Sequence, residues 1–105
     1  MNRVTKRQIL TVMAFYNKRG IPFRRKQLVR LLSILDDIFQ HETYLGEQLH
    51  KVGKRQIIGY FERTRHESDK TRLEKYQILR LFFSTANLKG KVPHPKLSGG
   101  NRFKD

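Results

Sequence analysis

Cysteine and tryptophan are absent from the 105-residue sequence, and only nine residues are acidic against 23 lysines and arginines. Without cysteine, the chain has no disulfide framework, no cysteine-ligated zinc site and no thiol nucleophile. No apolar run reaches the roughly 18 residues of a membrane-spanning helix. The N-terminus is basic but lacks the apolar core and cleavage site of a signal peptide. These absences predict one small cytoplasmic domain without contact to a membrane.

Motifs for common catalytic and cofactor sites are also missing. The sequence has no GxxxxGK[ST] or GxGxxG loop and no HExxH pair. Asp36 and Asp37 are adjacent on an expected helix, so their side chains point about 100° apart, which suits neither a shared proton nor a metal. No metal-ligand spacing relates the four histidines, which are His41, His50, His66 and His94. We therefore expect no catalytic residue, metal, cofactor or small-molecule ligand.

Positive charge is what the sequence has in excess, and it is unevenly placed. The formal net charge of +14 most often indicates a polyanionic partner, usually nucleic acid. Residues 1–30 contain nine lysines and arginines and no acid, whereas residues 31–50 contain four acids and no lysine or arginine. Residues 51–80 are basic again. Because uniform solubilising charge would not form such blocks, we expect a charged binding surface.

Apolar spacing predicts helices throughout the chain and no strand. The first helix is expected to begin at Thr5, with a capping box between Thr5 and Gln8, and to end at Gly20. A second, longer helix is expected over residues 24–45, with its leucines on one side. The pattern predicts an all-α protein, a compact bundle of four or five helices.

Two further helices complete the expected bundle. The third covers residues 54–64, and the fourth begins near Ser68 or Thr71, with a second capping box between Thr71 and Glu74. We divide the chain into an N-terminal helix at 1–23, an added element, a helical core at 24–88, and a basic flexible tail or linker at 89–105.

The last two expected helices carry a pattern more specific than helix spacing. Its residues are Ile57 and Tyr60 of an I-x-x-Y helix start, Ser68, Lys70 and Thr71 of a second helix start, and Leu79, Arg80, Phe82 and Phe83 of an LR-x-FF ending. A proline-containing linker follows at 89–95. This pattern resembles the core-binding domain of tyrosine recombinases, the SAM-like N-terminal DNA-binding domain of phage integrases. The resemblance covers about residues 24–97.

The resemblance implies a SAM-like fold, double-stranded DNA as partner, and a bacterial, phage or mobile-element origin. It also implies a catalytic domain or recombinase subunits as protein partners. In that family the arginine and histidine cluster and the nucleophilic tyrosine lie in a larger C-terminal domain, which has no counterpart in these 105 residues. We therefore expect no enzymatic activity, and none of the four tyrosines is taken for the nucleophile.

The resemblance places the DNA contacts at helix ends. At the start of the fourth helix they are Lys70, Thr71, Arg72 and Lys75, at the end of the third Arg63 and Arg65, and at the start of the second Arg24, Arg25, Lys26 and Arg30. For the fourth helix, physical chemistry agrees, because a helix N-terminus offers free N–H groups and positive charge to a phosphate. Arg80 lies within an apolar stretch, so we expect an ion pair with Asp36 or Asp37.

Two other classes remain open. One is a different basic helical nucleic-acid binder, either a helix-turn-helix regulator or an RNA-binding protein. Residues 20–28 offer a turn for the former, but the helix that follows is mostly apolar. The other is a helical protein-interaction module in which the positive charge meets an acidic protein.

Overall fold

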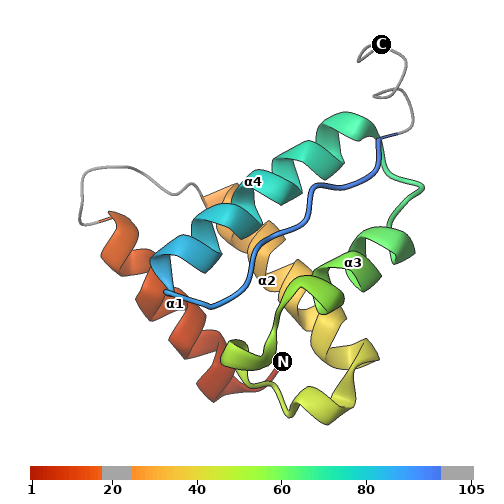
Figure 1. The fold of residues 1–105 in the computed structure, drawn as a ribbon. Helices are drawn as coiled ribbons and strands as arrows, with labels where there is room; N and C mark the ends of the chain where they lie inside the picture. The colour runs from red at the N-terminus through yellow and green to blue at the C-terminus, as the bar shows by residue number, and fades with distance from the viewer. Residues whose placement is uncertain (18–24, 98–105) are drawn as a thin grey trace.

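Four α-helices make up most of the structure (Figure 1). The computed structural model describes residues 1–17 and 25–97. Its elements are α1 (Arg3–Asn17), α2 (Arg25–His41), the short 3-10 helices η1 (Thr43–Leu45) and η2 (Leu49–Lys51), α3 (Lys54–Arg63) and α4 (Asp69–Thr85). The described residues contain no strand, so the predicted all-α bundle is confirmed. In these same residues, no helix combines the length and apolar character needed to cross a bilayer.

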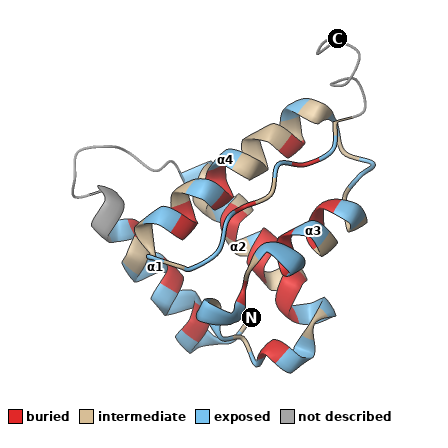
Figure 2. Ribbon diagram, in the orientation of Figure 1, coloured by how far each residue is buried: buried red, intermediate tan, exposed pale blue. Residues whose placement is uncertain are grey.

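One hydrophobic core joins all four helices, and Figure 2 shows the buried positions on the helix sides that face one another. It forms because each helix has an apolar stripe that leaves water on packing. Its largest fully buried side chains are Ile9, Met13, Leu31, Ile34, Leu35, Ile38, Val52, Ile57, Leu79 and Phe82. Ile9 and Met13 of α1 belong to this core, so α1 packs within the bundle.

The starts of α1 and α4 differ from the sequence predictions. Helix α1 begins two residues before Thr5, and the Asn2 side chain accepts a hydrogen bond from the backbone N–H of Thr5 at 2.8 Å. The hydroxyl of Thr5 donates instead to the carbonyl of Glu47, 3.2 Å away and far along the chain. The predicted Thr5–Gln8 capping box is therefore wrong, because a tertiary contact occupies its hydroxyl.

Ser68 is the cap of α4. Its Oγ accepts a hydrogen bond from the backbone N–H of Thr71 at 3.2 Å and donates one to the hydroxyl of Thr71 at 3.0 Å. The predicted start near Ser68 is thus confirmed, and the predicted Thr71–Glu74 capping box is wrong. Glu74 pairs with α2 instead.

Residues 89–97, the first part of the predicted flexible tail, pack on the bundle. Val92 and Pro95 are buried, and the His94 ring lies 4.8 Å from that of Tyr76. This extended segment, blue in Figure 1, returns along α4 and runs between that helix and α3 in the view. Residues 89–97 are therefore packed against the bundle, whereas their composition predicted a flexible tail. The rest of the predicted tail, residues 98–105, lies outside the described part of the chain.

Candidate nucleic-acid interface

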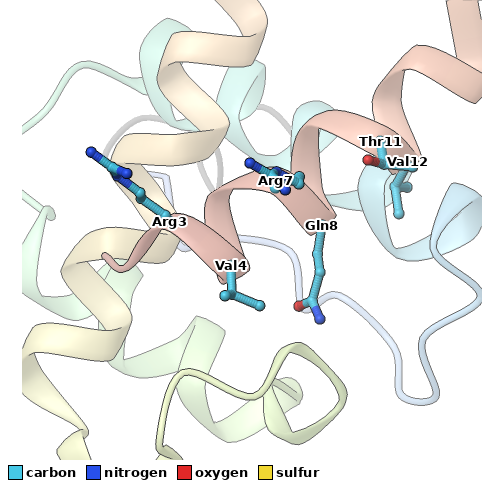
Figure 3. Close-up of a pocket in the computed structure, with 6 residues that line it drawn as sticks. All are labelled: Arg3, Val4, Arg7, Gln8, Thr11 and Val12. Carbon is cyan, nitrogen blue, oxygen red and sulfur yellow. The ribbon is translucent and has the colours of Figure 1, made fainter.

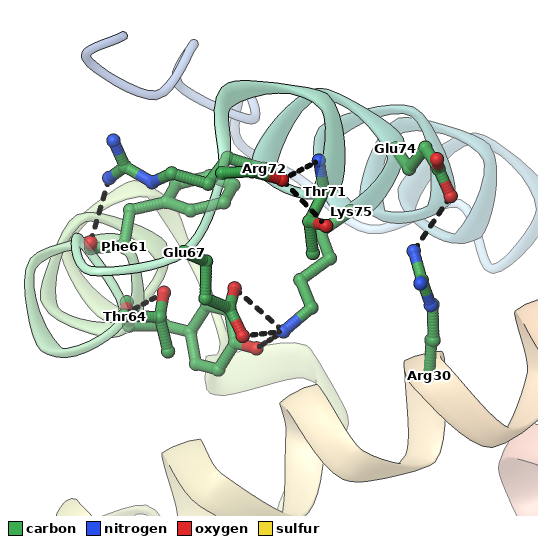
Figure 4. Close-up of polar contacts among 10 residues, drawn as sticks. Arg30, Phe61, Thr64, Glu67, Thr71, Arg72, Glu74 and Lys75 are labelled. Atoms are coloured by element: carbon green, nitrogen blue, oxygen red, sulfur yellow. Dashed lines mark hydrogen bonds and ion pairs between the residues drawn. The ribbon is translucent and has the colours of Figure 1, made fainter. Parts of the chain in front are cut away.

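The first candidate surface lies where the start of α2 meets α4. Lys26 and Arg30 are one turn apart on α2, and Lys70 and Glu74 are one turn apart on α4. Arg30 Nη1 lies 2.7 Å from Glu74 Oε2, and this ion pair links the two helices (Figure 4). Residues on both sides of this pair line a pocket of about 160 Å³. We call Arg25, Lys26, Arg30, Lys70 and Glu74 the α2–α4 face.

The end of α3 meets the same side of α2 farther along. Asp37 is spaced so that it continues the line of Lys26 and Arg30 on that helix. Its Oδ1 accepts hydrogen bonds from Arg63 Nε at 3.0 Å and Arg63 Nη2 at 2.6 Å. Arg65 follows in the turn and is exposed. The start of α4 therefore meets the start of α2, whereas the end of α3 meets the same side of α2 farther along, about three turns from the beginning of that helix.

Accessibility differs among the predicted contacts. Arg25, Lys26, Arg65 and Lys70 are exposed and make no ion pair with another described residue. Arg30 and Arg63 are each paired with one acid, but their side chains stay 26% and 28% exposed. These six cations remain available to an anion. Arg24 lies outside the described residues.

Arg72 points into the protein instead. This residue is 4% exposed, and its guanidinium donates to the carbonyls of Phe61 and Lys96. The guanidinium carbon also lies 5.7 Å from the centre of the Phe61 ring. Arg72 thus ties α3, α4 and the 89–97 segment together, and the prediction that it contacts DNA does not agree with its burial.

Lys75 is also held inside the bundle. Its Nζ donates to Tyr60 Oη at 2.7 Å and to both carboxylate oxygens of Glu67 at 2.9 Å (Figure 4). Burial by itself lowers the pKa of Lys75, but the hydrogen bonds with Tyr60 and Glu67 outweigh it and hold the pKa above its usual value. Burial raises the pKa of Tyr60. Because its charge is balanced and 88% of its side chain is covered, Lys75 does not fit the predicted role of a DNA contact.

Thr71 and Arg80 also have local roles. The Thr71 backbone and hydroxyl take part in the cap of α4 described above. Arg80 is exposed, with its guanidinium carbon 5.6 Å from the centre of the Tyr76 ring. The predicted ion pair of Arg80 is wrong, since Asp36 accepts from the Met1 amine at 2.7 Å and Asp37 pairs with Arg63.

A second group of cations was not predicted from the sequence. Gly90 meets Gly53 so closely that a Cβ on Gly90 would lie 4.0 Å from the Gly53 Cα. Basic residues follow or precede both glycines within two positions in the chain, and Arg80 lines a pocket with Gly90 and Lys91. We call Lys51, Lys54, Arg55, Arg80, Lys89 and Lys91 the Gly53–Gly90 cluster. Its sequence signal is a glycine among basic residues in two places, KVGKR and KGK.

The outer side of α1 forms a separate concave surface. Arg3, Val4, Arg7, Gln8, Thr11 and Val12 line a pocket of about 640 Å³ there. Figure 3 shows Arg3 and Arg7 pointing away from Val4 and Gln8. None of the ten predicted contact residues lies in this pocket. The basic side chains of α1 therefore provide a control of equal charge for substitutions in the α2–α4 face and the Gly53–Gly90 cluster.

No protein-family model, curated protein or solved structure matches the chain. The resemblance to tyrosine recombinases thus stays a prediction. Within residues 1–17 and 25–97, no group of three or more histidine and carboxylate side chains is arranged to hold a metal ion.

Proposed function

We propose that the chain is a non-catalytic, cytoplasmic duplex-DNA-binding domain that holds DNA phosphates through the α2–α4 face and the neighbouring end of α3. The observation that carries this proposal is that cations from the start of α4 and the end of α3 lie along one side of α2, together with those at the start of α2 itself. Arg25, Lys26, Arg65 and Lys70 are exposed there, beside the half-exposed Arg30 and Arg63. We also propose that the chain is related to a recombinase core-binding domain. On this proposal it comes from a mobile element and acts together with a catalytic domain.

Phosphate contacts explain this arrangement better than base readout. Long, exposed lysine and arginine side chains reach phosphates on a duplex and release its counterions. Such contacts position a protein on DNA without specifying a sequence. We therefore expect weak intrinsic sequence preference.

The aromatic side chains favour a duplex over a single strand. Single-strand binding relies on exposed rings on which bases stack. Phe61, Phe82 and Phe83 are at most 5% exposed, so these rings serve the core, and the exposed Tyr44 lies in η1, outside the proposed surface. Duplex DNA is thus expected to bind more tightly than a single strand of equal length.

The experiment compares two variants of equal charge. The triple variant Arg25→Gln, Lys26→Gln, Lys70→Gln is expected to bind a 20-base-pair duplex about tenfold or more weakly than the unmodified chain. Arg3→Gln, Lys6→Gln, Arg7→Gln removes the same charge from α1 and is expected to change the affinity less than about threefold. Fluorescence anisotropy in low salt measures both. Equal losses in the two variants would show a general charge effect and refute the proposed face.

A further inference from the structure

We propose that the Gly53–Gly90 cluster is a second phosphate-binding surface, so that one molecule bridges two segments of duplex DNA. The inference rests on the proposed function of the α2–α4 face and extends it to a second site. Its six cations are Lys51, Lys54, Arg55, Arg80, Lys89 and Lys91, and all six side chains are exposed. None of them forms an ion pair within the described part of the chain.

The two stretches of chain that supply the cluster contain no negative charge. Residues 48–61 and 75–97, which supply all six cations, include no aspartate or glutamate. The pocket lined by Arg80, Gly90 and Lys91 has only neutral residues besides these two cations. The cluster therefore differs from the α2–α4 face, where Glu74 offsets Arg30. Because no acid forms an ion pair with these six cations in the described part of the chain, an anion outside the protein adds a favourable interaction to each.

The folded backbone holds the two halves of the cluster together. Gly90 has a φ of +98°, which side-chain-bearing residues rarely adopt, and this turn brings it against Gly53. After the turn, Val92 is buried and Arg72 binds the carbonyl of Lys96. Lys89 and Lys91 are thus part of a fixed surface, which reduces the entropy lost when they bind a partner.

The 89–97 segment, which supplies Lys89 and Lys91 to the cluster, lies on the opposite side of α4 from the α2–α4 face, and Arg80 lies between the two sides. Glu74 and Gln77 line the pocket against α2. Arg72 donates a hydrogen bond to the 89–97 segment, and Phe83 lines a pocket with it. Around the axis of α4, Arg72 and Phe83 lie about half a turn from Glu74 and Gln77. In Figure 1, α2 crosses behind α4, and the 89–97 segment runs beside α4 on the side of α3. A straight duplex held on one side therefore leaves the other side free for a second duplex.

The composition of the cluster favours DNA over an acidic protein. Four of its six residues are lysines, which are depleted in protein–protein interfaces and common at phosphates. Protein interfaces also have an apolar centre, whereas the cluster is defined by charged side chains on solvent-exposed turns and helix starts. Negative charge repeated along a phosphate backbone fits such a row of cations.

A capture experiment tests the bridge. One duplex is fixed to beads, a second labelled duplex of unrelated sequence is added in low salt, and the label retained by the full chain is measured. The unmodified chain is expected to retain label. The variant Lys54→Gln, Arg55→Gln, Lys91→Gln is expected to retain about tenfold less label. Its affinity for a single duplex is expected to fall less than about threefold, because that duplex binds the α2–α4 face. The α1 triple variant, with equal charge loss, is expected to retain label like the unmodified chain.

The outcomes separate the two proposals. Capture that is unchanged in the cluster variant would overturn the second site, and would point to self-association as the source of bridging. Capture that falls equally in the cluster and α1 variants would overturn it in favour of net charge alone. A cluster variant that bridges normally but loses binding to polyglutamate would overturn it in favour of an acidic protein. Failure of the α2–α4 face appears separately, as unchanged single-duplex affinity in the Arg25, Lys26 and Lys70 variant.

Discussion

At the scale of single residues, Arg72 and Lys70 show how direction on a helix decides the role of a cation. Both lie in the first turn of α4, two positions apart. Lys70 is exposed, whereas the Arg72 guanidinium is covered and hydrogen-bonded to the carbonyls of Phe61 and Lys96. Because a two-residue step turns the side chain by about 200° around the helix, one cation faces solvent and the other faces the core.

Replacing Arg72 is expected to destabilise the fold. Arg72→Met keeps a long apolar stem but leaves the carbonyls of Phe61 and Lys96 without their donor, so the free energy of unfolding is expected to fall by roughly 2 to 3 kcal/mol. Arg80→Met, at an exposed position over Tyr76, is expected to cost less than about 1 kcal/mol. Urea unfolding measures both. An equal loss of unfolding free energy in the two variants would refute the proposal that Arg72 holds α3, α4 and the 89–97 segment together.

At the scale of elements, Lys75 connects α4 to α3 and to the turn between them. Its bonds with Tyr60 and Glu67 lie beside the apolar contacts of the same helices. The network is satisfied when Lys75 is charged and Tyr60 is protonated, because Lys75 donates to the Tyr60 oxygen and to Glu67. The packing of α3 on α4 therefore depends on the protonation of both groups.

This dependence predicts a loss of stability in alkali. The pKa values of Tyr60 and Lys75 are raised above their usual 10.0 and 10.5, so the folded state holds both protons more tightly than the unfolded state does. Their contribution is complete below about pH 10 and is lost as the pH rises through the folded-state pKa values.

The measurement is urea unfolding between about pH 8 and about pH 11. Tyr60→Phe removes one of the two titrating groups, and its stability is expected to fall less over this range than that of the unmodified chain. Tyr44→Phe changes an exposed tyrosine and is expected to keep the full loss. A loss in Tyr60→Phe as large as in Tyr44→Phe would contradict the role of this network.

At the scale of the whole molecule, the fold sorts the basic side chains of residues 1–17 and 25–97 into distinct groups. Some are internal, as Arg72 and Lys75 are. Others form the α2–α4 face, and a third group forms the Gly53–Gly90 cluster. Since only nine acids are present, the surface keeps a strong positive charge. Such a surface attracts a polyanion at long range, and salt screens that attraction.

Duplex binding is therefore expected to be steeply salt-dependent. Six to ten phosphate contacts cost about 10³- to 10⁵-fold in affinity between about 50 and 200 mM salt. The variant Arg25→Gln, Lys26→Gln, Lys70→Gln is expected to lower the slope of log affinity against log salt by about 2 to 3, because three phosphate contacts are lost. Anisotropy titrations across salt concentrations measure this slope. A flat slope in the unmodified chain would rule out phosphate contacts.

The expected helices agree well with the fold, because each depends on local spacing. The stripe of Leu31, Leu35 and Ile38 predicts α2, and all three are buried. The caps were harder to predict, since Thr5 binds a carbonyl 42 residues away and Glu74 binds α2. Two of the predicted helix ends contact the same side of α2. Sequence spacing could not separate the exposed Lys70 from the buried Arg72, because the burial of Arg72 also depends on the position of the 89–97 segment.

The sequence by itself determined that the protein is helical, basic and organised around apolar stripes, because periodicity and charge are properties of neighbouring residues. Only the tertiary structure decided which cations face solvent, since that depends on segments far apart in the chain. The meeting of Gly53 with Gly90 is the clearest case. Neither KVGKR nor KGK forms a surface alone, and the packing of residues 89–97 against α3 and α4 makes one from both.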